Sequence, residues 1–315
     1  MDRRDFVRAS ALGTSLAAGL PLRVAVPGRR LVERWSWVMG QSVHILLFAE
    51  NDDQGLEAAS RALAELRRIE GALSRFDDAS DLCELNRQAG RRPVQIGADL
   101  MAVLAAGTRI KAASAGAFNL AVEPLMRAWG FRDSRRAPPS EQELREACDT
   151  LAAAEIRLAG DRAFLPSAST QLDSGGIGVG YGLDRAGAVL RSAGISQALI
   201  DISGDCLALG APPGETGWAV DIASPGDRGG IDRTVSLRDQ GLATSSNLES
   251  IIQLGAIIAG HVMDPRTGHP ASRERQSTVI APRAIEADGF STAALITGNP
   301  GPGTIFAAAP RNASR

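Results

Sequence analysis

The segment from Thr278 to Gly298 constrains the fold more tightly than any other part of the chain. Residues 278–281 form an apolar run typical of a strand, and residues 293–296 continue an apolar helix that Gly298 would end. The pattern therefore predicts a strand, a short loop and a helix in direct succession. Asp288 and Thr292 are four residues apart, so a helix would place their side-chain oxygens on one face.

The Asp288/Thr292 pair has two interpretations. A carboxylate beside a hydroxyl at a helix N-terminus suits a hard divalent cation that keeps some of its waters and shares a phosphate ligand. Alternatively, Asp288 is the N-cap of the helix and Thr292 only packs. The segment taken alone favours the N-cap, and the rest of the chain shifts the balance toward the cation.

The composition excludes some classes of function. With 315 residues, of which 44% are hydrophobic, the chain can bury a substantial core as one large domain or two small ones. Without the six Arg and two Asp of residues 1–30, 28 basic and 34 acidic residues remain. This mildly acidic body lacks the basic surface that nucleic acid requires, so we expect no nucleic-acid partner.

Residues 1–30 are typical of an export signal rather than of a folded domain. The pair Arg3-Arg4, followed by Phe6-Val7-Arg8, resembles a twin-arginine signal. The weakly apolar run 9–22 that follows is too short to span a bilayer, and it leads to small residues near position 25. The sequence therefore predicts an exported or periplasmic protein.

Periodicity predicts both helices and strands over the rest of the chain. Apolar spacing indicates helices over 54–73, 82–86, 98–114 and 141–153, and another that continues to about 193. Strands are expected at 43–48, 156–158, 162–165, 198–202 and 218–223, with a hairpin-like pair at 234–237 and 242–244. These elements predict an α+β fold, a mixed sheet core flanked by helices.

A glycine-rich run precedes the helix that ends near 193. Gly175, Gly176, Gly178 and Gly180 occupy four of six consecutive positions, which lets a backbone approach a ligand closely and present N–H groups to an anion. The spacing does not match the Rossmann fingerprint. A tight loop that only lets helix and sheet pack is as good an explanation as anion binding.

Several motifs occur in a characteristic order between about residue 37 and residue 298. They are Met39-Gly40; Ser74, Ser80 and Asn86; Gly116-Ala117-Phe118-Asn119, Pro124-Leu125 and Trp129-Gly130-Phe131; Asp173, Gly180-Tyr181 and Asp184; Gly204-Asp205; Trp218; Ala243-Thr244-Ser245; His261 and Asp264-Pro265-Arg266-Thr267-Gly268; and Ala287-Asp288 with Thr292. In order and spacing this set resembles the ApbE family, the FAD:protein FMN transferases.

The resemblance implies a Mg²⁺-dependent enzyme that splits the pyrophosphate of FAD. FMN passes to a Thr or Ser hydroxyl of a target protein, expected to be a membrane-associated redox protein, and AMP is released. The family acts on the outer side of bacterial membranes, so attachment to the outer face of the inner membrane is expected. The implied domains are an export signal at 1–30, a transferase domain at 31–298 with FAD in a cleft between two lobes, and a flexible tail at 299–315.

The resemblance also implies roles for individual residues. Asp288 and Thr292 match the metal-ligand positions, and Gly176 matches a position whose backbone oxygen can join them. The positions that match flavin contacts are Met39, Phe76, Ala117, Phe118, Asn119, Asp173, Val179 and His261. His261 also suits a general base or a phosphate contact, because a histidine has the appropriate pKa to accept the proton of an acceptor hydroxyl. His261 and Asp288 are therefore the expected catalytic residues.

Two other functions remain open at this point. Water could replace the acceptor hydroxyl, which would make the protein a Mg²⁺-dependent FAD pyrophosphatase that releases FMN and AMP. The chain could also bind FAD without reacting with it.

Overall fold

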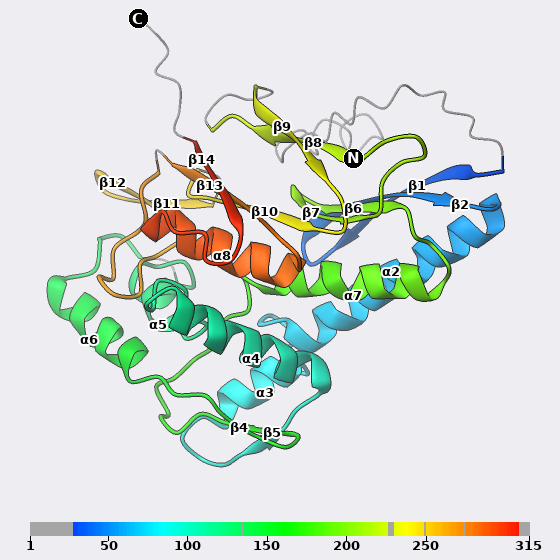
Figure 1. Ribbon diagram of the computed structural model, residues 1–315. Coiled ribbons are helices and arrows are strands. Elements are labelled where there is room, and N and C mark those ends of the chain that lie inside the picture. The colour runs from blue at the N-terminus through cyan, green and yellow to red at the C-terminus, as the bar shows by residue number, and fades with distance from the viewer. Residues whose placement is uncertain (1–27, 134, 226–229, 249, 274, 309–315) are drawn as a thin grey trace, which may run out of the picture.

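A seven-stranded antiparallel sheet forms the centre of the molecule (Figure 1). The computed structural model describes residues 28–133, 135–225, 230–248, 250–273 and 275–308. The strand order is β1-β2-β6-β7-β10-β13-β14, and each neighbouring pair is antiparallel. The strands span Arg30–Val38 (β1), Gln41–Ala49 (β2), Ala198–Ile202 (β6), Asp205–Leu209 (β7), Gly241–Ser246 (β10), Gln276–Ala281 (β13) and Thr304–Ala308 (β14).

The expected α+β class is confirmed, but the sheet is not mixed. Parallel neighbours need a long crossover, whereas antiparallel neighbours can be joined by a tight turn. Here β1–β2 and β6–β7 are connected by two-residue turns, at Met39-Gly40 and Ser203-Gly204, with φ positive at all four residues. These turns fix the antiparallel pairing.

Both faces of the sheet are covered (Figure 1). One face packs on α2 (Asp52–Leu73), α7 (Gly178–Ser192) and α8 (Ala284–Thr297), and the other carries a hairpin of β8 (Trp218–Ala223) and β9 (Ile231–Leu237). Val43, Ile45 and Leu47 of β2 face the helices, while Leu46 and Phe48 pack with the hairpin. Burial on both sides explains why β2 is a continuous apolar run rather than an alternating one.

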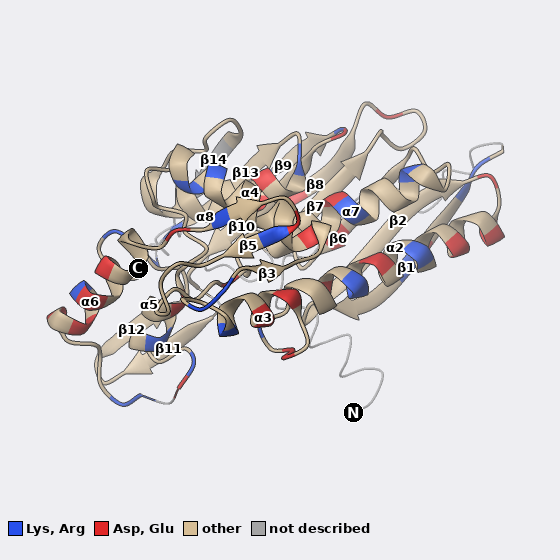
Figure 2. Cartoon of the chain, turned by 90° about the horizontal axis from the view of Figure 1, so that it is seen from below, with Lys and Arg blue, Asp and Glu red and all other residues tan. Residues whose placement is uncertain are grey.

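A second layer lies beyond the three helices. It contains α3 (Asp81–Arg87), α4 (Ala98–Ala113), α5 (Glu123–Ala128), α6 (Glu141–Ala152) and a small sheet of β3 (Val94–Gln95), β5 (Arg162–Phe164) and β4 (Arg157–Ala159). The β11–β12 hairpin (Ile251–Leu254, Ile257–Gly260) packs on α5 and α6. Charged residues follow the outer surfaces of α2 and α6 (Figure 2), as expected for helices with one buried face.

Helix α8 lies between the sheet and the second layer and is buried almost all round. Phe290, Ala293 and Ala294 join the core around α4, whereas Ala284 joins the core beneath the sheet and Ala287 contacts Ala243 of β10. A helix buried on several sides is expected to be apolar on several sides. Polar residues within it therefore need a specific explanation.

Most predicted elements form within two residues of their expected bounds, but the predicted hairpin-like pair is wrong. The segments at 234–237 and 242–244 do not pair with each other: β9 pairs with β8, and β10 pairs with β7 and β13. The tail is not wholly without structure, because β14 adds a strand to β13 at one end of the sheet. The unpaired backbone N–H and C=O groups at a sheet edge can pair with any extended segment. The apolar pattern of the tail is too weak to predict a strand there.

The predicted export signal falls almost entirely on residues 1–27, outside the described part of the chain. Within that described part, none of the helices has the length and apolar character needed to cross a bilayer.

Candidate functional site

Helix α8 begins at Ala284, one turn before the start predicted from the sequence, so Asp288 is not its N-cap. Asp184 of α7 caps the helix from outside: its carboxylate accepts hydrogen bonds from the N–H of Ala284 at 2.8 Å and of Ile285 at 3.4 Å. The N-cap residue itself, Arg283, makes no side-chain cap. Gly298 ends the helix in the left-handed conformation, as predicted.

Because the helix starts early, Asp288 and Thr292 lie well inside it. Asp288 is buried, and its Oδ2 accepts a hydrogen bond of 2.9 Å from the N–H of Gly180. A Cβ on Gly180 would come within 2.3 Å of the Ala284 carbonyl oxygen, so only glycine permits this approach of α7 to α8. The glycine-rich run thus serves packing and also presents an N–H to an anion, which here is the chain's own carboxylate.

Gly176 lies next to Thr292, as the predicted metal site requires. A Cβ built on Gly176 would be 3.2 Å from the Thr292 hydroxyl oxygen and 3.4 Å from the ring of Phe118. The fold therefore brings the three predicted metal residues, Gly176, Asp288 and Thr292, to one place.

A second carboxyl group, on the half-buried Asp205 at the start of β7, lies in the electrostatic range of Asp288. Burial raises the pKa of Asp288 to about 7, partly offset by the Gly180 N–H. Burial also raises the pKa of Asp205 well above its usual range, and the negative charge of Asp288 raises it further. Among the described residues, neither carboxylate forms an ion pair with Arg, Lys or His.

Hydroxyl groups complete this region, which we call the α8 oxygen cluster: Asp205, Ser245, Asp288, Ser291 and Thr292. Ser245 of β10 lies 2.8 Å from the Ser291 oxygen and 3.2 Å from the Thr292 oxygen. The side chains offer oxygen atoms, and the two carboxyl groups accept backbone N–H groups from Gly180 and Thr244 rather than pairing with a described cationic side chain. This chemistry fits a hard divalent cation such as Mg²⁺, which prefers oxygen and commonly uses one or two carboxylates.

The described residues contain no group of three or more His, Cys, Asp and Glu side chains that could hold a metal on their own. A Mg²⁺ site at Asp288 would therefore depend on the Thr292 hydroxyl, the Gly176 carbonyl, water and substrate phosphate for its remaining ligands. Such incomplete protein coordination is usual for Mg²⁺ at phosphate-transfer sites.

A contrasting cluster, the arginine network, surrounds two other carboxylates. Glu123 is almost fully buried and contacts Arg75 at 2.8 Å, Arg132 at 2.9 Å and Arg127 at 3.3 Å. Arg132 and Arg75 also reach Asp173, at 2.5 and 3.6 Å. Every acidic group here has a cationic partner, so the network holds α5 against the loop that leads to Gly176.

His261 follows β12 and is influenced by the arginine network. Burial lowers the pKa of His261, while a hydrogen bond at Ser250 and the charge of Asp173 oppose the shift and Arg132 supports it. The imidazole is therefore neutral near pH 7. Its Nδ1 atom is buried and has no hydrogen-bond partner among the residues that the structure describes, an arrangement that leaves a nitrogen free for a substrate atom.

The other predicted flavin contacts have varied surroundings. Ala117 and Phe118 are buried in the core around α4, and Asn119 bonds to the backbone of Leu151 and Ala121. Met39 and Val179 are partly buried and pack against the core beneath the sheet. Phe76 is 85% exposed, with the Arg75 guanidinium 4.9 Å from its ring centre. The structure thus offers one large unpacked aromatic ring beside the arginine network.

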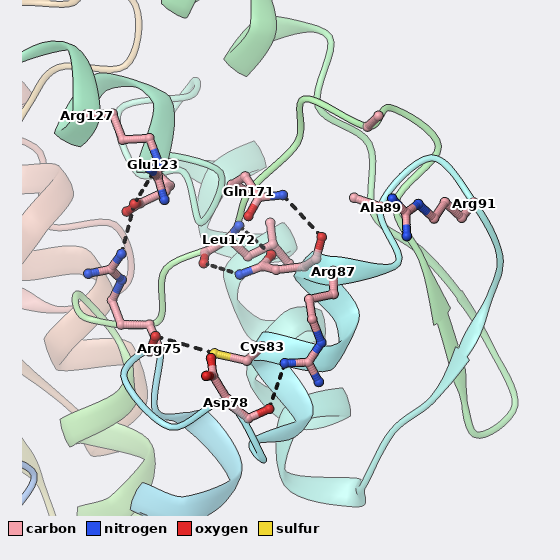
Figure 3. A pocket seen from close by; sticks show the side chains of 12 residues that line it. Arg75, Asp78, Cys83, Arg87, Ala89, Arg91, Glu123, Arg127, Gln171 and Leu172 are labelled. Atoms are coloured by element: carbon pink, nitrogen blue, oxygen red, sulfur yellow. Dashed lines mark hydrogen bonds and ion pairs between the residues drawn. The ribbon is translucent and has the colours of Figure 1, made fainter. Parts of the chain in front are cut away.

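A surface cavity of about 420 Å³ opens beside the arginine network (Figure 3). Arg75, Glu123 and Arg127 line one side of it, and Arg87 and Arg91 line the other. None of the predicted flavin-contact residues is among its lining residues. The predicted flavin cleft is therefore not this cavity and stays a prediction.

Three features of the site were not assigned roles from the sequence. Asp205 and Ser245 belong to the ordered motifs described above, and Glu123 adjoins one of them. Motif membership alone did not indicate the contacts that these residues make. Asp205 begins β7 and Ser245 lies near the end of β10, and both strands contact α8. Their position at strand ends was the signal in the sequence that could have pointed to the site.

Comparison with known proteins agrees with the ordered motifs. A model of the ApbE family matches residues 39–310. A Treponema pallidum protein named FAD:protein FMN transferase is 30% identical over 292 residues, 86% of this chain and 81% of that protein. An Escherichia coli K12 protein of the same name is 27% identical over 251 residues, 77% of this chain and 69% of that protein.

Solved structures give the same result. The ApbE protein of Thermotoga maritima superposes with a TM-score of 0.78 at 25% identity, covering 85% of this chain and 87% of that one. The flavinyl transferase ApbE of Pseudomonas stutzeri, in its apo form, gives a TM-score of 0.74 at 26% identity and covers 85% of each chain. Since the family match spans most of the sequence, the chain belongs to the ApbE family.

Proposed function

We propose that this protein transfers FMN from FAD to a Thr or Ser hydroxyl of a target protein and releases AMP. The family match over residues 39–310 and relatives named FAD:protein FMN transferase support the transfer itself. The observation that carries the chemistry is the convergence of Gly176, Asp288 and Thr292 at a place where the buried carboxyl of Asp288 has no described cationic partner.

In the proposed reaction the acceptor oxygen forms a bond to the FMN phosphorus. The bond from that phosphorus to the oxygen bridging toward AMP breaks, and AMP leaves with the bonding electrons. A Mg²⁺ ion held by Asp288, Thr292 and the Gly176 carbonyl would neutralise charge on the phosphate oxygens. His261 would accept the hydroxyl proton, because its lowered pKa keeps it neutral and its Nδ1 lacks a partner in the described structure.

The flavin would lie near the arginine network. Phe76 offers an exposed aromatic face, and Asp173 and His261 approach from the neighbouring loops. Phe118, which lies beside Gly176, would connect the flavin position to the proposed cation. Met39, Ala117, Asn119 and Val179 are proposed to shape this position through the backbone and by packing.

The direct test is protein flavinylation. The full chain is incubated with FAD, Mg²⁺ and a candidate acceptor protein, and the acceptor is examined by intact mass spectrometry for added FMN. Thr292→Val should abolish the adduct, whereas Thr297→Val on the same helix should not. AMP release without any acceptor would indicate a pyrophosphatase instead, and bound FAD that stays intact with Mg²⁺ would indicate a binding protein.

We also propose that the protein acts outside the cytoplasm, on the basis of the arginine pair and short apolar run in residues 1–30. The expected target is then an exported or membrane-associated redox protein. Cell fractionation of the full chain should find it in the periplasm or on the outer face of the inner membrane. Replacing both Arg3 and Arg4 with Lys should retain it in the cytoplasm, and unchanged export would refute this route.

A further inference from the structure

Three hydroxyl groups in the α8 oxygen cluster form a connected chain. Ser291 Oγ lies 2.8 Å from the carbonyl oxygen of Asp288, Ser245 Oγ lies 2.8 Å from Ser291 Oγ, and Thr292 Oγ1 lies 3.2 Å from Ser245 Oγ. Ser291 is buried, and Ser245 and Thr292 are half-buried. Each contact is within hydrogen-bonding distance, so the direction of each bond can be worked out from the protons.

The direction follows from the fact that each hydroxyl carries one proton. A carbonyl oxygen only accepts, so Ser291 donates its proton to Asp288. Ser245 must then be the donor in its bond to Ser291. Because the proton of Ser245 is used there, Thr292 must be the donor in its bond to Ser245. The chain therefore runs in one direction, from Thr292 through Ser245 and Ser291 to the Asp288 carbonyl.

Other threonines in the helices of this protein behave differently. Thr108, Thr150 and Thr297 each donate to the carbonyl four residues earlier, at 2.8, 2.9 and 3.0 Å. This back-bonding is the ordinary choice for a threonine within a helix. For Thr292 the equivalent acceptor is the Asp288 carbonyl, which Ser291 already engages. Thr292 instead turns its hydroxyl toward Ser245 and Gly176.

We propose that Ser245 and Ser291 are positioning residues that fix the orientation of the Thr292 hydroxyl. By accepting the Thr292 proton, Ser245 leaves the lone pairs of Thr292 Oγ1 free to face a divalent cation. By engaging the Asp288 carbonyl, Ser291 removes the competing partner of Thr292. This inference rests on the proposed function, because it assumes the cation at Asp288 and Thr292.

The consequence is a dependence of cation affinity on two serines that are not themselves ligands. Outer partners of metal ligands typically change metal affinity by about 10- to 100-fold. Ser245→Ala removes the acceptor, so the Thr292 proton must find another partner and the hydroxyl rotates. Ser245→Thr keeps a hydroxyl at the same position and should restore the affinity. Ser246→Ala, at the neighbouring position of β10, is the matched control.

The experiment is a titration of the full chain with Mn²⁺ alone, in which the concentration of free Mn²⁺ is measured by electron paramagnetic resonance. Wild-type protein should bind Mn²⁺, and Asp288→Ala and Thr292→Val should remove most of the binding. Ser245→Ala and Ser291→Ala should each weaken binding by about 10-fold, while Ser245→Thr and Ser246→Ala should match wild type. Thermal melts without metal identify any variant that simply fails to fold.

A double-mutant cycle separates positioning from a general structural role. In a Thr292→Val background, Ser245→Ala should cause no further loss, because the group it orients is already gone. An equal further loss in that background would overturn the inference. Wild-type affinity in Ser245→Ala, with affinity lost in Asp288→Ala, would refute the inference and leave the proposed function intact. Absence of any Asp288-dependent Mn²⁺ binding would overturn both.

Discussion

The α8 oxygen cluster and the arginine network both contain two carboxylates, but their charges are handled in opposite ways. Glu123 and Asp173 share Arg75 and Arg132 within 3.6 Å. Asp288 and Asp205 have no cationic partner among the described residues, and burial raises the pKa of both. Two carboxyl groups without a cationic partner are costly to charge, so each favours either a proton or a cation that comes from outside the chain.

The two regions should therefore serve different purposes, the arginine network in stability and the α8 oxygen cluster in the reaction. In the arginine network each carboxylate has a cationic partner, so the network can hold α5 and the 171–176 loop together without a ligand. The carboxyl groups of the α8 oxygen cluster need a proton or, in the proposed reaction, a cation to balance them. Loss of a carboxylate should therefore damage stability in the first region and function in the second.

The largest expected effect is on stability, at Glu123. Glu123→Gln leaves three arginines facing a neutral group, and breaking a buried ion pair in this way typically costs about 3–5 kcal/mol. Denaturant unfolding measures the loss. The matched control is Glu155→Gln, which breaks an exposed pair with Arg157 and should change the free energy of unfolding by less than about 1 kcal/mol. Equal losses in the two variants would break the comparison.

The next effect should have the opposite sign. Without metal at pH 8, Asp288→Asn should raise the free energy of unfolding by about 1–3 kcal/mol, because it removes an uncompensated buried charge and keeps an acceptor for the Gly180 N–H. Added Mg²⁺ should raise the melting temperature of wild type and not of the variant. A destabilised Asp288→Asn protein in the absence of metal would contradict this account.

The pH dependence of the free energy of unfolding should also report the raised pKa of the Asp288 carboxyl. The folded-state pKa of Asp288 is about 7, above the ordinary value of 3.8. The folded state therefore holds the proton more tightly, and its stability falls as pH rises from about 4 to about 7. Subtracting the Asp288→Asn profile from the wild-type profile gives the contribution of Asp288 together with its effect on Asp205, which should total up to about 4 kcal/mol in metal-free protein. A flat difference profile would show that the carboxyl is not perturbed.

The smallest effect concerns the exposed ring beside the arginine network. Phe76→Leu should weaken FAD binding by about 1 kcal/mol, or about fivefold, because an aromatic stack is lost and apolar contact is kept. Stability should change by less than about 0.5 kcal/mol, since the side chain is exposed. Flavin fluorescence titration measures the affinity. An unchanged affinity would show that the flavin does not bind against Phe76.

Local sequence patterns predicted the helix, strand and glycine positions that depend on neighbours along the chain. The strand at 276–281, the end of α8 at Gly298 and the shared face of Asp288 and Thr292 follow from periodicity and spacing. The start of α8 does not, because its cap is Asp184, 100 residues earlier in the chain. A local pattern cannot show a cap of this kind, and Asp288 therefore resembled an N-cap.

The candidate site shows the same division. The ordered motifs indicated Gly176, Asp288 and Thr292, and the fold brings them together. The roles of Ser245 and Asp205 could not be predicted, since both depend on strands that reach α8 only through the sheet order β7-β10-β13. The pairing of Glu123 with three arginines is likewise non-local for Arg75, 48 residues away.

The central claim is that a cation at Asp288 makes the FAD pyrophosphate reactive toward an acceptor hydroxyl. AMP release from FAD, measured with an acceptor protein in the presence of Mg²⁺ or of a chelator, tests it most directly. The account predicts rapid release with Mg²⁺, loss of release with the chelator, and a loss of more than about 100-fold in Asp288→Ala with Mg²⁺ present, with no further loss when the chelator is added. Undiminished release from Asp288→Ala, or from chelated wild type, would contradict it.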